Sequence, residues 1–389
     1  MVLGLIRPAR SARDAGLLLG LLSIQAGTAL AAEPAASYTI QARTSSSLIP
    51  TAPSLGQMML GGAAMGSKRQ IQRNLDLTLT APVPPPARPE ASHAIPPGMA
   101  MGAALSLAGT GTGVCTAGDC GLKETREAIE QMRSRRVLLY WGCEAKAGAG
   151  QPETLEAGRN PLLQGMEEML RQYKGQLAAP STTWTSWPHP GDERAIPAQA
   201  SLAGDHLVRS NYAPEIRFPL AQAQDFLGPL NLSAAPAGGA TGLSWNRVAG
   251  VVGYRAMAMG QPGGESAPVV LWVSSRGGET ASNADNSARL QSLVNSGALL
   301  GAERNQCTIS AEASRALGMA AVTLEGYTGA ISLNPAPGRL VRLERSTTGI
   351  AMLGMPQLEG TGAAGGAAPA EQAPQPAPRP GFGLLKGLF

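Results

Sequence analysis

The residues suited to acid-base chemistry are few and lie close together. The stretch GDHLVRSN places Asp205 directly beside His206, and serines occur nearby at Ser201, Ser210 and Ser233. A serine activated by a histidine, with an acid that orients the imidazole, is the arrangement of serine hydrolases. The sequence has no G-x-S-x-G turn to present such a serine. We therefore expect Asp205 and His206 to hydrogen-bond a turn, and a hydrolase remains an alternative.

Sulfur-containing side chains suggest a second chemistry, metal binding. The chain has 14 Met, and thioethers favour Cu(I). Several methionines occur close together in the sequence, in short groups. These are Met58, Met59, Met65, Met99, Met101, Met257, Met259, Met352 and Met355. Because their spacing is mixed and His is scarce, we expect core filling, with copper handling as the alternative. Zinc-type spacing of Cys and His is absent, so we expect neither a metal nor another cofactor.

The chain contains four cysteines, a number that suits disulfide formation in an oxidising compartment. They are Cys115, Cys120, Cys143 and Cys307. Gly118 permits a tight turn between the first two, so Cys115–Cys120 is the preferred bridge. Cys143 and Cys307 then either join the two halves of the chain or remain free thiols.

Trp184 and Trp187 lie in a Pro-rich stretch without periodicity, where we expect their rings to be exposed. Such a pair suits stacking on sugar rings. Trp141 and Trp272 lie in apolar runs, so we expect both in the core. Trp184 and Trp187 are therefore the candidate residues for binding a surface polysaccharide.

The first 31 residues have the features of a secretory signal peptide. Arg7, Arg10 and Arg13 flank an apolar run, and Ala29 and Ala31 form a small-x-small cleavage site. We expect cleavage after Ala31 and a location in the periplasm or at the cell surface, with an N-terminal membrane anchor as the alternative. The leader carries three Arg and one Asp, so its removal lowers the net charge from +4 to about +2. That charge offers no basis for binding nucleic acid.

The composition favours a mainly β fold. Gly 49 and Pro 31 make about a fifth of the 389 residues, which disfavours long helices and suits short strands joined by turns. We predict two sandwich-like domains of the fibronectin type III or immunoglobulin kind, with a few short helices and disordered termini. The bounds are 32–178 for a β-rich domain with a covering helix, 179–213 for a boundary region, 214–356 for the second domain and 357–389 for a disordered tail.

Local patterns place the individual elements. In the N-terminal part they predict strands at 37–42, 75–83 and 137–141, helices at 122–136 and 160–175, irregular polar sequence in the rest of 32–75 and a Pro-rich loop at 82–98. In the C-terminal part they predict strands at 215–220, 242–246, 253–259, 269–275, 320–327 and 339–345, and helices at 285–300 and 310–317.

The stretch GLSWNRVAGVVGYRAMAMG carries a specific strand pattern. Leu243 and Trp245 are two residues apart and face the same side of a strand, Gly250 helps to make the bend, and Tyr254 begins the return strand. The pattern L-x-W-x-x-V-x-G-x-x-x-Y resembles the second and third strands of fibronectin type III-like domains. This resemblance implies that Trp245 and Tyr254 are core residues of opposed sheets.

Alternation along the return strand then sets the direction of its methionines. If Tyr254 faces the core, Met257 and Met259 face outward. They form either an adaptable binding surface or, as we favour, a face covered by a helix such as the one after Asp285.

A broader resemblance covers four segments, VLLYWGCEAKAGAGQPE, WPHPGDERAIPAQASLAGDHLVRSNYAPEIRF, QDFLGPL and the Trp–Tyr stretch. In that order they resemble a family of uncharacterised exported proteins of Gram-negative bacteria. The resemblance implies export and a β-rich, two-part architecture, and it implies no activity.

The tail from Leu358 to Pro380 consists almost only of Gly, Ala, Pro and Gln, which suits a linker. It ends in GFGLLKGLF, where Phe382, Leu385 and Phe389 could dock in a groove or contact a membrane surface, or the end is unstructured. The sequence thus predicts a non-enzymatic protein of the cell envelope that binds an envelope protein or polysaccharide. A surface carbohydrate-binding module is the main alternative.

Overall fold

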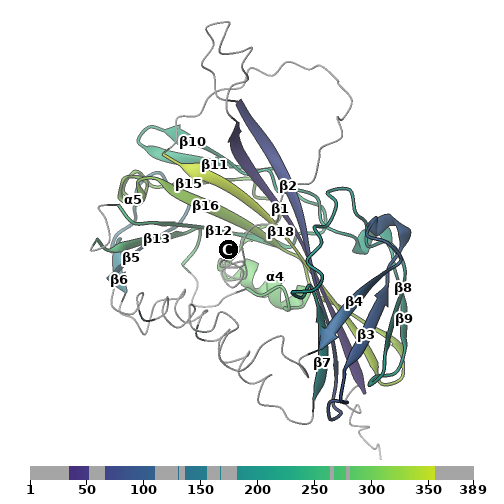
Figure 1. Cartoon of the computed structure of the whole chain (residues 1–389). Coiled ribbons are helices and arrows are strands. Elements are labelled where there is room, and N and C mark those ends of the chain that lie inside the picture. The colour runs from purple at the N-terminus through teal and green to yellow at the C-terminus, as the bar shows by residue number, and fades with distance from the viewer. Residues whose placement is uncertain are drawn as a thin grey trace, which may run out of the picture. The chain divides into compact units, whose positions relative to one another are not determined.

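The computed structural model describes residues 35–51, 66–109, 130, 136–155, 167, 182–262, 267–276 and 281–354. Strands dominate these residues and the helices are short (Figure 1), as the composition predicts. No helix in these ranges has both the length and the apolar character needed to cross a membrane. The predicted helices at 122–136 and 160–175 lie almost wholly outside the described residues.

One sheet contains fifteen strands. Its order is β6 (Glu153–Leu155), β5 (Val137–Trp141), β13 (Val269–Val273), β12 (Gly253–Gly260), β16 (Ala320–Tyr327), β18 (Arg339–Leu353), β1 (Ala36–Thr51), β2 (Gly66–Ala81), β7 (Thr183–Trp187), β4 (Ala104–Gly109), β3 (Glu90–Ala94), β8 (Gly204–Ser210) and β9 (Ile216–Leu220). Beside this path, β14 (Leu300–Gly301) pairs with β12 and β17 (Ile331–Ala336) pairs with β18. The sheet takes strands from both predicted domains and from the region between them, so 179–213 is not a break in the sheet.

A second, three-stranded sheet is formed by β10 (Ser233–Ala237), β11 (Ala240–Ser244) and β15 (Gln306–Ile309). Leu243 and Ile309 of this sheet belong to the same buried cluster as Trp272 and Val322 of the large sheet. The two sheets therefore share one core, as in a sandwich. The Cys143–Cys307 disulfide links β15 to the residue two positions after β5, with 4.7 Å between the Cα atoms.

The Trp–Tyr stretch lies where these two sheets meet. Trp245 follows β11, Tyr254 is in β12, and their rings are 5.8 Å apart in an edge-to-face arrangement. The Val248 N–H donates a hydrogen bond to the Tyr254 hydroxyl oxygen at 3.1 Å. Gly250 makes the bend in the left-handed region, with φ +85°. The prediction that Trp245 and Tyr254 are core residues is confirmed, and Trp245 lies directly after a strand of the smaller sheet rather than within it.

Two short helices pack on the sheets. In α5 (Ala311–Leu317) the Ser310 side chain caps the first turn by accepting from the Ala313 N–H, and Leu317 is buried in the shared core. In α4 (Ser287–Asn295) Asn286 is the cap, and Leu290 and Leu293 pack with Tyr327 in a separate cluster. Both helices and all six strands predicted after residue 214 are present. Most end points shift by one or two residues, but α4 ends five residues earlier and β18 eight residues later than predicted.

The parallel pair β1 and β18 forms the middle of the large sheet. One face of β18 changes in character along the strand: Leu343 packs in one hydrophobic cluster, Thr347 is polar and buried, and Leu353 packs in another cluster. The same face of β1 changes from Ile40 to the buried Thr44. The polar middle of each strand therefore needs hydrogen-bond partners above it.

The chain at 221–232, which we call the strap, crosses this polar middle and supplies those partners. Thr44 Oγ1 donates to the Leu227 carbonyl at 2.8 Å, and Thr347 Oγ1 donates to the Gly228 carbonyl at 2.9 Å. The buried Arg345 donates to the carbonyls of Ala223 and Asp225 at 2.7 and 3.1 Å. The strap explains why strand structure continues through polar sequence that we expected to be irregular.

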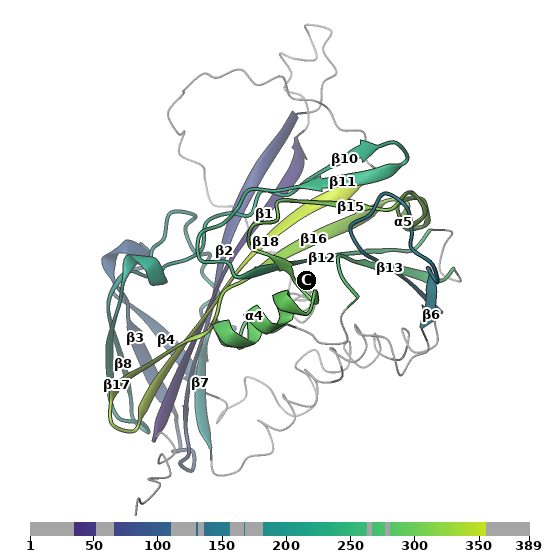
Figure 2. The same cartoon turned by 180° about the vertical axis from the view of Figure 1, so that it is seen from behind.

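Beyond β2 the sheet curls, and β9 at its end contacts β17 (Figure 2). The inward side chains of the curl form a hydrophobic cluster that includes Leu77, Leu105, Val208 and Phe218. The loop predicted at 82–98 is wrong in part, because β3 and a 3-10 turn (Pro97–Met99) lie within it. The boundary region is likewise not a loop, since β7 and β8 lie within it and pair with strands distant in the sequence.

Candidate binding groove

A chain of hydrogen bonds through the interior of the curl connects three of its strands. Tyr38 of β1, His93 of β3 and His206 of β8 are all buried. The Tyr38 hydroxyl lies 2.8 Å from His93 Nδ1, and His93 Nε2 lies 2.9 Å from His206 Nδ1. His206 Nε2 lies 2.7 Å from the Leu202 carbonyl oxygen. Aromatic contacts enclose the chain, including Phe218 stacked on His206 with ring centroids 5.0 Å apart.

When both imidazoles are neutral, the last acceptor of this chain fixes where every proton lies. A carbonyl oxygen only accepts, so His206 Nε2 carries the single proton of its ring and His206 Nδ1 accepts. His93 Nε2 must then donate, His93 Nδ1 accepts, and Tyr38 donates. Burial lowers the pKa of His93 to about 3, with the neighbouring His206 as a second cause, and burial also lowers the pKa of His206. Both imidazoles are neutral, and this chain of hydrogen bonds holds the strands together.

Because the buried side chains alternate with outward ones, the same strands present a second, polar set of residues to the exterior. On the outward face Ser106 of β4 is opposite Ser92 of β3, and Ser92 is opposite Arg209 of β8. These three side chains are exposed. They line a groove of about 700 Å³, whose lining also includes Arg88, Glu90, Ala108, Gly109, Ser210 and Asn211.

One end of the groove is held in place by Asn211. Its side-chain oxygen accepts from the Glu90 N–H at 3.0 Å, and its side-chain nitrogen donates to the Arg88 carbonyl at 2.8 Å. The Asn211 N–H also donates to the Glu90 carbonyl at 3.1 Å. A Cβ on Gly109 would come within 2.7 Å of the Pro89 Cβ, so glycine permits close packing here. Arg88 is therefore carried on a tightly fixed segment.

Glu215 holds the other guanidinium of the groove. Its carboxylate accepts from Arg209 Nε at 2.8 Å and from Arg217 Nε at 2.6 Å. These hydrogen bonds lower the pKa of Glu215. All three side chains are substantially exposed, so the pairs contribute little to stability and serve mainly to orient the two arginines.

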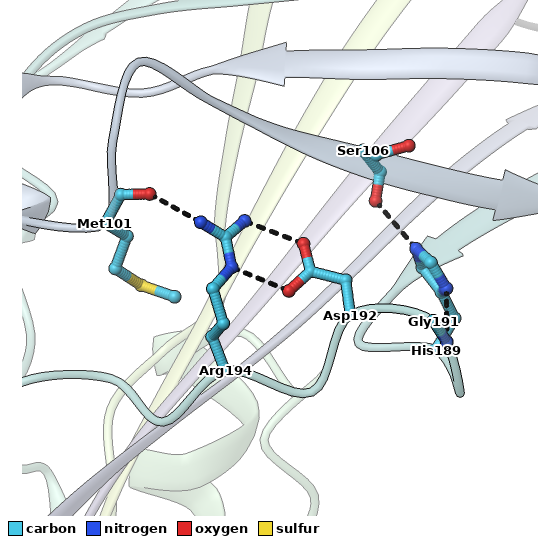
Figure 3. Close-up of polar contacts among 6 residues, drawn as sticks. All are labelled: Met101, Ser106, His189, Gly191, Asp192 and Arg194. Atoms are coloured by element: carbon cyan, nitrogen blue, oxygen red, sulfur yellow. Dashed lines mark hydrogen bonds and ion pairs between the residues drawn. The ribbon is translucent and has the colours of Figure 1, made fainter. Parts of the chain in front are cut away.

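A loop packs beside the groove on the segment that leads into β4 (Figure 3). The Arg194 guanidinium donates two hydrogen bonds of 2.7 Å to Asp192 and a third of 2.9 Å to the Met101 carbonyl. The bonds from Arg194 hold the pKa of Asp192 at about 2. His189 accepts from the Gly191 N–H at 3.2 Å and donates to the Ser106 carbonyl at 3.2 Å, so the loop supports the strand that carries a groove hydroxyl.

A smaller hollow of about 300 Å³ adjoins the groove along the β3–β8 pair. Ala94 and Leu207 line it, and each is two residues from a groove residue, Ser92 and Arg209 respectively. The hollow is more apolar than the groove, although Asp205 and Arg217 also line it.

The residues considered for a hydrolase do not converge. Asp205 is exposed and His206 is buried, since neighbours on a strand face opposite sides. The Ser201 hydroxyl donates to Asp225 at 2.5 Å. Ser210 donates to the Ala213 carbonyl at 3.1 Å, and Ser233 lies in the other sheet. We had expected Asp205 and His206 to hydrogen-bond one turn, and this is wrong. The histidine is instead part of the buried hydrogen-bond chain.

The predicted tryptophan platform is wrong in its second residue. Both tryptophans lie in β7, where Trp187 is 2% exposed and packs in the core of the curl. Trp184 is three residues before Trp187 on the strand. This odd spacing places Trp184 on the outward face, where it is half-buried. The two rings therefore cannot form one exposed surface.

The methionine pair of β12 faces away from Tyr254, as alternation predicts. Met257 and Met259 are half-buried against a cluster that includes Val269 and Leu271, rather than in the cluster of α4. Met99 and Met101 are buried in the curl and Met352 is exposed, so the described methionines do not gather in one place. Over the same ranges, no three His, Cys, Asp or Glu side chains gather to hold a metal ion.

The Cys143–Cys307 bridge is confirmed as the pairing that joins the two halves. Cytoplasmic thiols are normally kept reduced, so this disulfide is consistent with a location outside the cytoplasm. The other predicted residues, Cys115 and Cys120 and the tail residues Phe382, Leu385 and Phe389, lie outside the described ranges.

Sequence reasoning missed the groove residues because Arg88 and Ser92 lie in a segment dominated by proline. A signal was present: EASHA and ALSLAG both alternate small polar residues with buried ones. β3 lies beside β8 only because it pairs with a strand more than a hundred residues away in the sequence. No protein-family model, curated protein or solved structure matches this chain.

Proposed function

We propose that this chain is an exported, non-enzymatic protein of the cell envelope that binds a polysaccharide in the outward groove of β4, β3 and β8. The observation that carries the proposal is the groove itself, about 700 Å³ in volume. Hydroxyl, guanidinium and carboxylate groups line it, and these are the groups that hydrogen-bond sugar hydroxyls.

Two features support binding rather than catalysis at this place. His93 and His206 are hydrogen-bonded within the buried chain, and His189, in the loop beside β4, is hydrogen-bonded at both ring nitrogens. Two of the three strands beneath the groove, β3 and β8, are linked by the Tyr38–His93–His206 chain, so their groove residues are held on a preorganised surface. A long polymer suits an open, strand-built surface of this kind.

The location in the periplasm or at the cell surface, after cleavage of the leader, belongs to the same proposal. The disulfide supports it. The proposal also includes the tail residues 381–389 as an attachment to an envelope partner, so a chain that ends at Pro380 is expected to leave the envelope fraction while it keeps its fold.

The test is binding of the mature chain to polysaccharides extracted from the envelope of the producing cell. We expect Ser92→Trp to fill the groove and abolish binding. Ser244→Trp is the control, because Ser244 is an exposed strand serine of the other sheet. If no envelope polysaccharide binds, or if both variants bind like the unaltered chain, the proposed function is wrong.

A further inference from the structure

The charges of the groove are unequal. Among its lining residues Arg88 and Arg209 are cationic and Glu90 is the single carboxylate, which leaves a net charge of +1. Asp205 belongs to the adjoining hollow, four residues from Arg209 along β8. Glu215 neutralises one charge but is shared by Arg209 and Arg217. The groove therefore favours an anionic ligand over a neutral one.

Both guanidinium groups of the groove have N–H donors that no described residue uses. Arg209 uses its Nε atom for Glu215, and within the described ranges its terminal nitrogens have no hydrogen-bond partner. The Arg88 side chain has no hydrogen bond or ion pair within these ranges either, and Asn211 fixes the backbone that carries it. A guanidinium binds a planar carboxylate through two parallel N–H donors.

The hydroxyl groups in the same row as Arg209 have a different role. Ser92 is opposite Arg209 in one strand pair and opposite Ser106 in the next, so a charged end and a hydroxyl end lie in one row across the sheet. A carboxylate-bearing sugar has both kinds of partner, a planar anion and ring hydroxyls.

We infer that the groove selects acidic polysaccharides, with Arg88 and Arg209 binding the carboxylate of a uronic acid residue and Ser92 and Ser106 binding its hydroxyls. This inference rests on the proposed function and narrows the ligand class. Arg88 and Arg209 are binding residues, and Asn211 and Glu215 are positioning residues.

The experiment measures binding of the mature chain to polygalacturonate and alginate, each compared with its methyl-esterified form. Esterification removes the charge and keeps the sugar backbone. We expect the acidic forms to bind at least about tenfold more tightly, and we expect this preference to weaken as NaCl is raised. Arg209→Gln and Arg88→Gln should each remove most of the preference.

Arg217→Gln is the matched control for Arg209→Gln. Arg217 has the same charge, a similar exposure and the same partner Glu215, but it does not line the groove. It should keep the preference for the acidic forms. Equal binding of acidic and esterified polymers, or binding of only a neutral envelope glycan, would overturn the acidic specificity and leave the proposed function standing. If no polysaccharide of any kind binds, both are wrong.

Discussion

His93 and His206 are hydrogen-bonded to each other inside the curl, His93 Nε2 to His206 Nδ1 at 2.9 Å. Their strands, β3 and β8, are direct neighbours in the sheet, although the two residues are far apart in the sequence. An added proton would place a charge on a buried imidazole, and it would reverse the direction of the His93 hydrogen bonds toward Tyr38.

This relationship predicts acid sensitivity. The folded-state pKa of His93 is lowered to about 3 and that of His206 is also lowered, whereas unfolded histidine has a pKa of about 6.5. Below pH ~6.5 the unfolded chain binds more protons, so the stabilisation is complete above this pH and is lost as the pH falls. For His93 the slope approaches about 1.4 kcal/mol per pH unit below pH ~6.5, and His206 adds to it in the same direction.

Urea denaturation between pH 7.5 and 5 measures this slope. The carboxylates with lowered pKa values, such as Asp192 and Glu215, affect the slope only at more acidic pH, where they begin to bind protons. His93→Gln should flatten the pH dependence in this range. A slope that is the same in the variant and in the unaltered protein would contradict the assignment.

Tyr254→Phe should destabilise the shared core of the two sheets. The substitution leaves the Val248 N–H without its acceptor in a buried position, at a cost of about 1–3 kcal/mol. Tyr140→Phe is the control, since Tyr140 lies in the same cluster and its hydroxyl has no hydrogen bond within the described part of the chain. Guanidinium denaturation of both variants gives the comparison, and equal losses would argue against the Val248 bond.

The two tryptophans of β7 should differ in their effect on stability. Trp187→Ala removes a ring that is 2% exposed and should cost about 3–5 kcal/mol. Trp184→Ala, on the outward face, should change stability by less than about 1 kcal/mol. Thermal denaturation followed by circular dichroism tests this contrast, which disappears if β7 faces the other way.

The strap predicts a contrast between two neighbouring threonines. Thr347→Val leaves the Gly228 carbonyl without its hydrogen bond and should cost about 1–2 kcal/mol. Thr348→Val is nearly the same chemical change on the opposite face, where no side-chain hydrogen bond of Thr348 occurs in the described ranges. Limited proteolysis within 221–232 should increase only for Thr347→Val. Similar cleavage of both variants would show that Thr347 does not hold the strap.

Loss of the Cys143–Cys307 bridge should lower stability by about 2–5 kcal/mol, because the bridge restrains residues 164 positions apart and links the two sheets. The double variant Cys143→Ser, Cys307→Ser, compared with the unaltered protein in guanidinium, measures the difference. An unchanged midpoint would mean that the shared core is sufficient without the bridge.

The sequence by itself predicted the elements in which a short local pattern indicates which side chains are buried. The resemblance carried by L-x-W-x-x-V-x-G-x-x-x-Y implied that Trp245 and Tyr254 are core residues, and with Tyr254 inward, alternation placed Met257 outward. The helical patterns at 285–300 and 310–317 located the two helices, which the structure shows to be capped by Asn286 and Ser310. In these cases one strand or one turn contains the whole signal, because side-chain direction follows from the period of the element.

The tertiary structure alone decided what depends on partners distant in the sequence. The serine- and threonine-rich half of β1 is a strand because the strap satisfies its buried hydroxyls, as for Thr44. Trp187 is in the core because β7 pairs with β2, and no nearby residue indicates that pairing. The groove exists because β3 pairs with β4 on one side and β8 on the other, which brings Ser106, Ser92 and Arg209 into one row. Register between distant strands is set by the packing of the whole sheet, so a local pattern does not contain it.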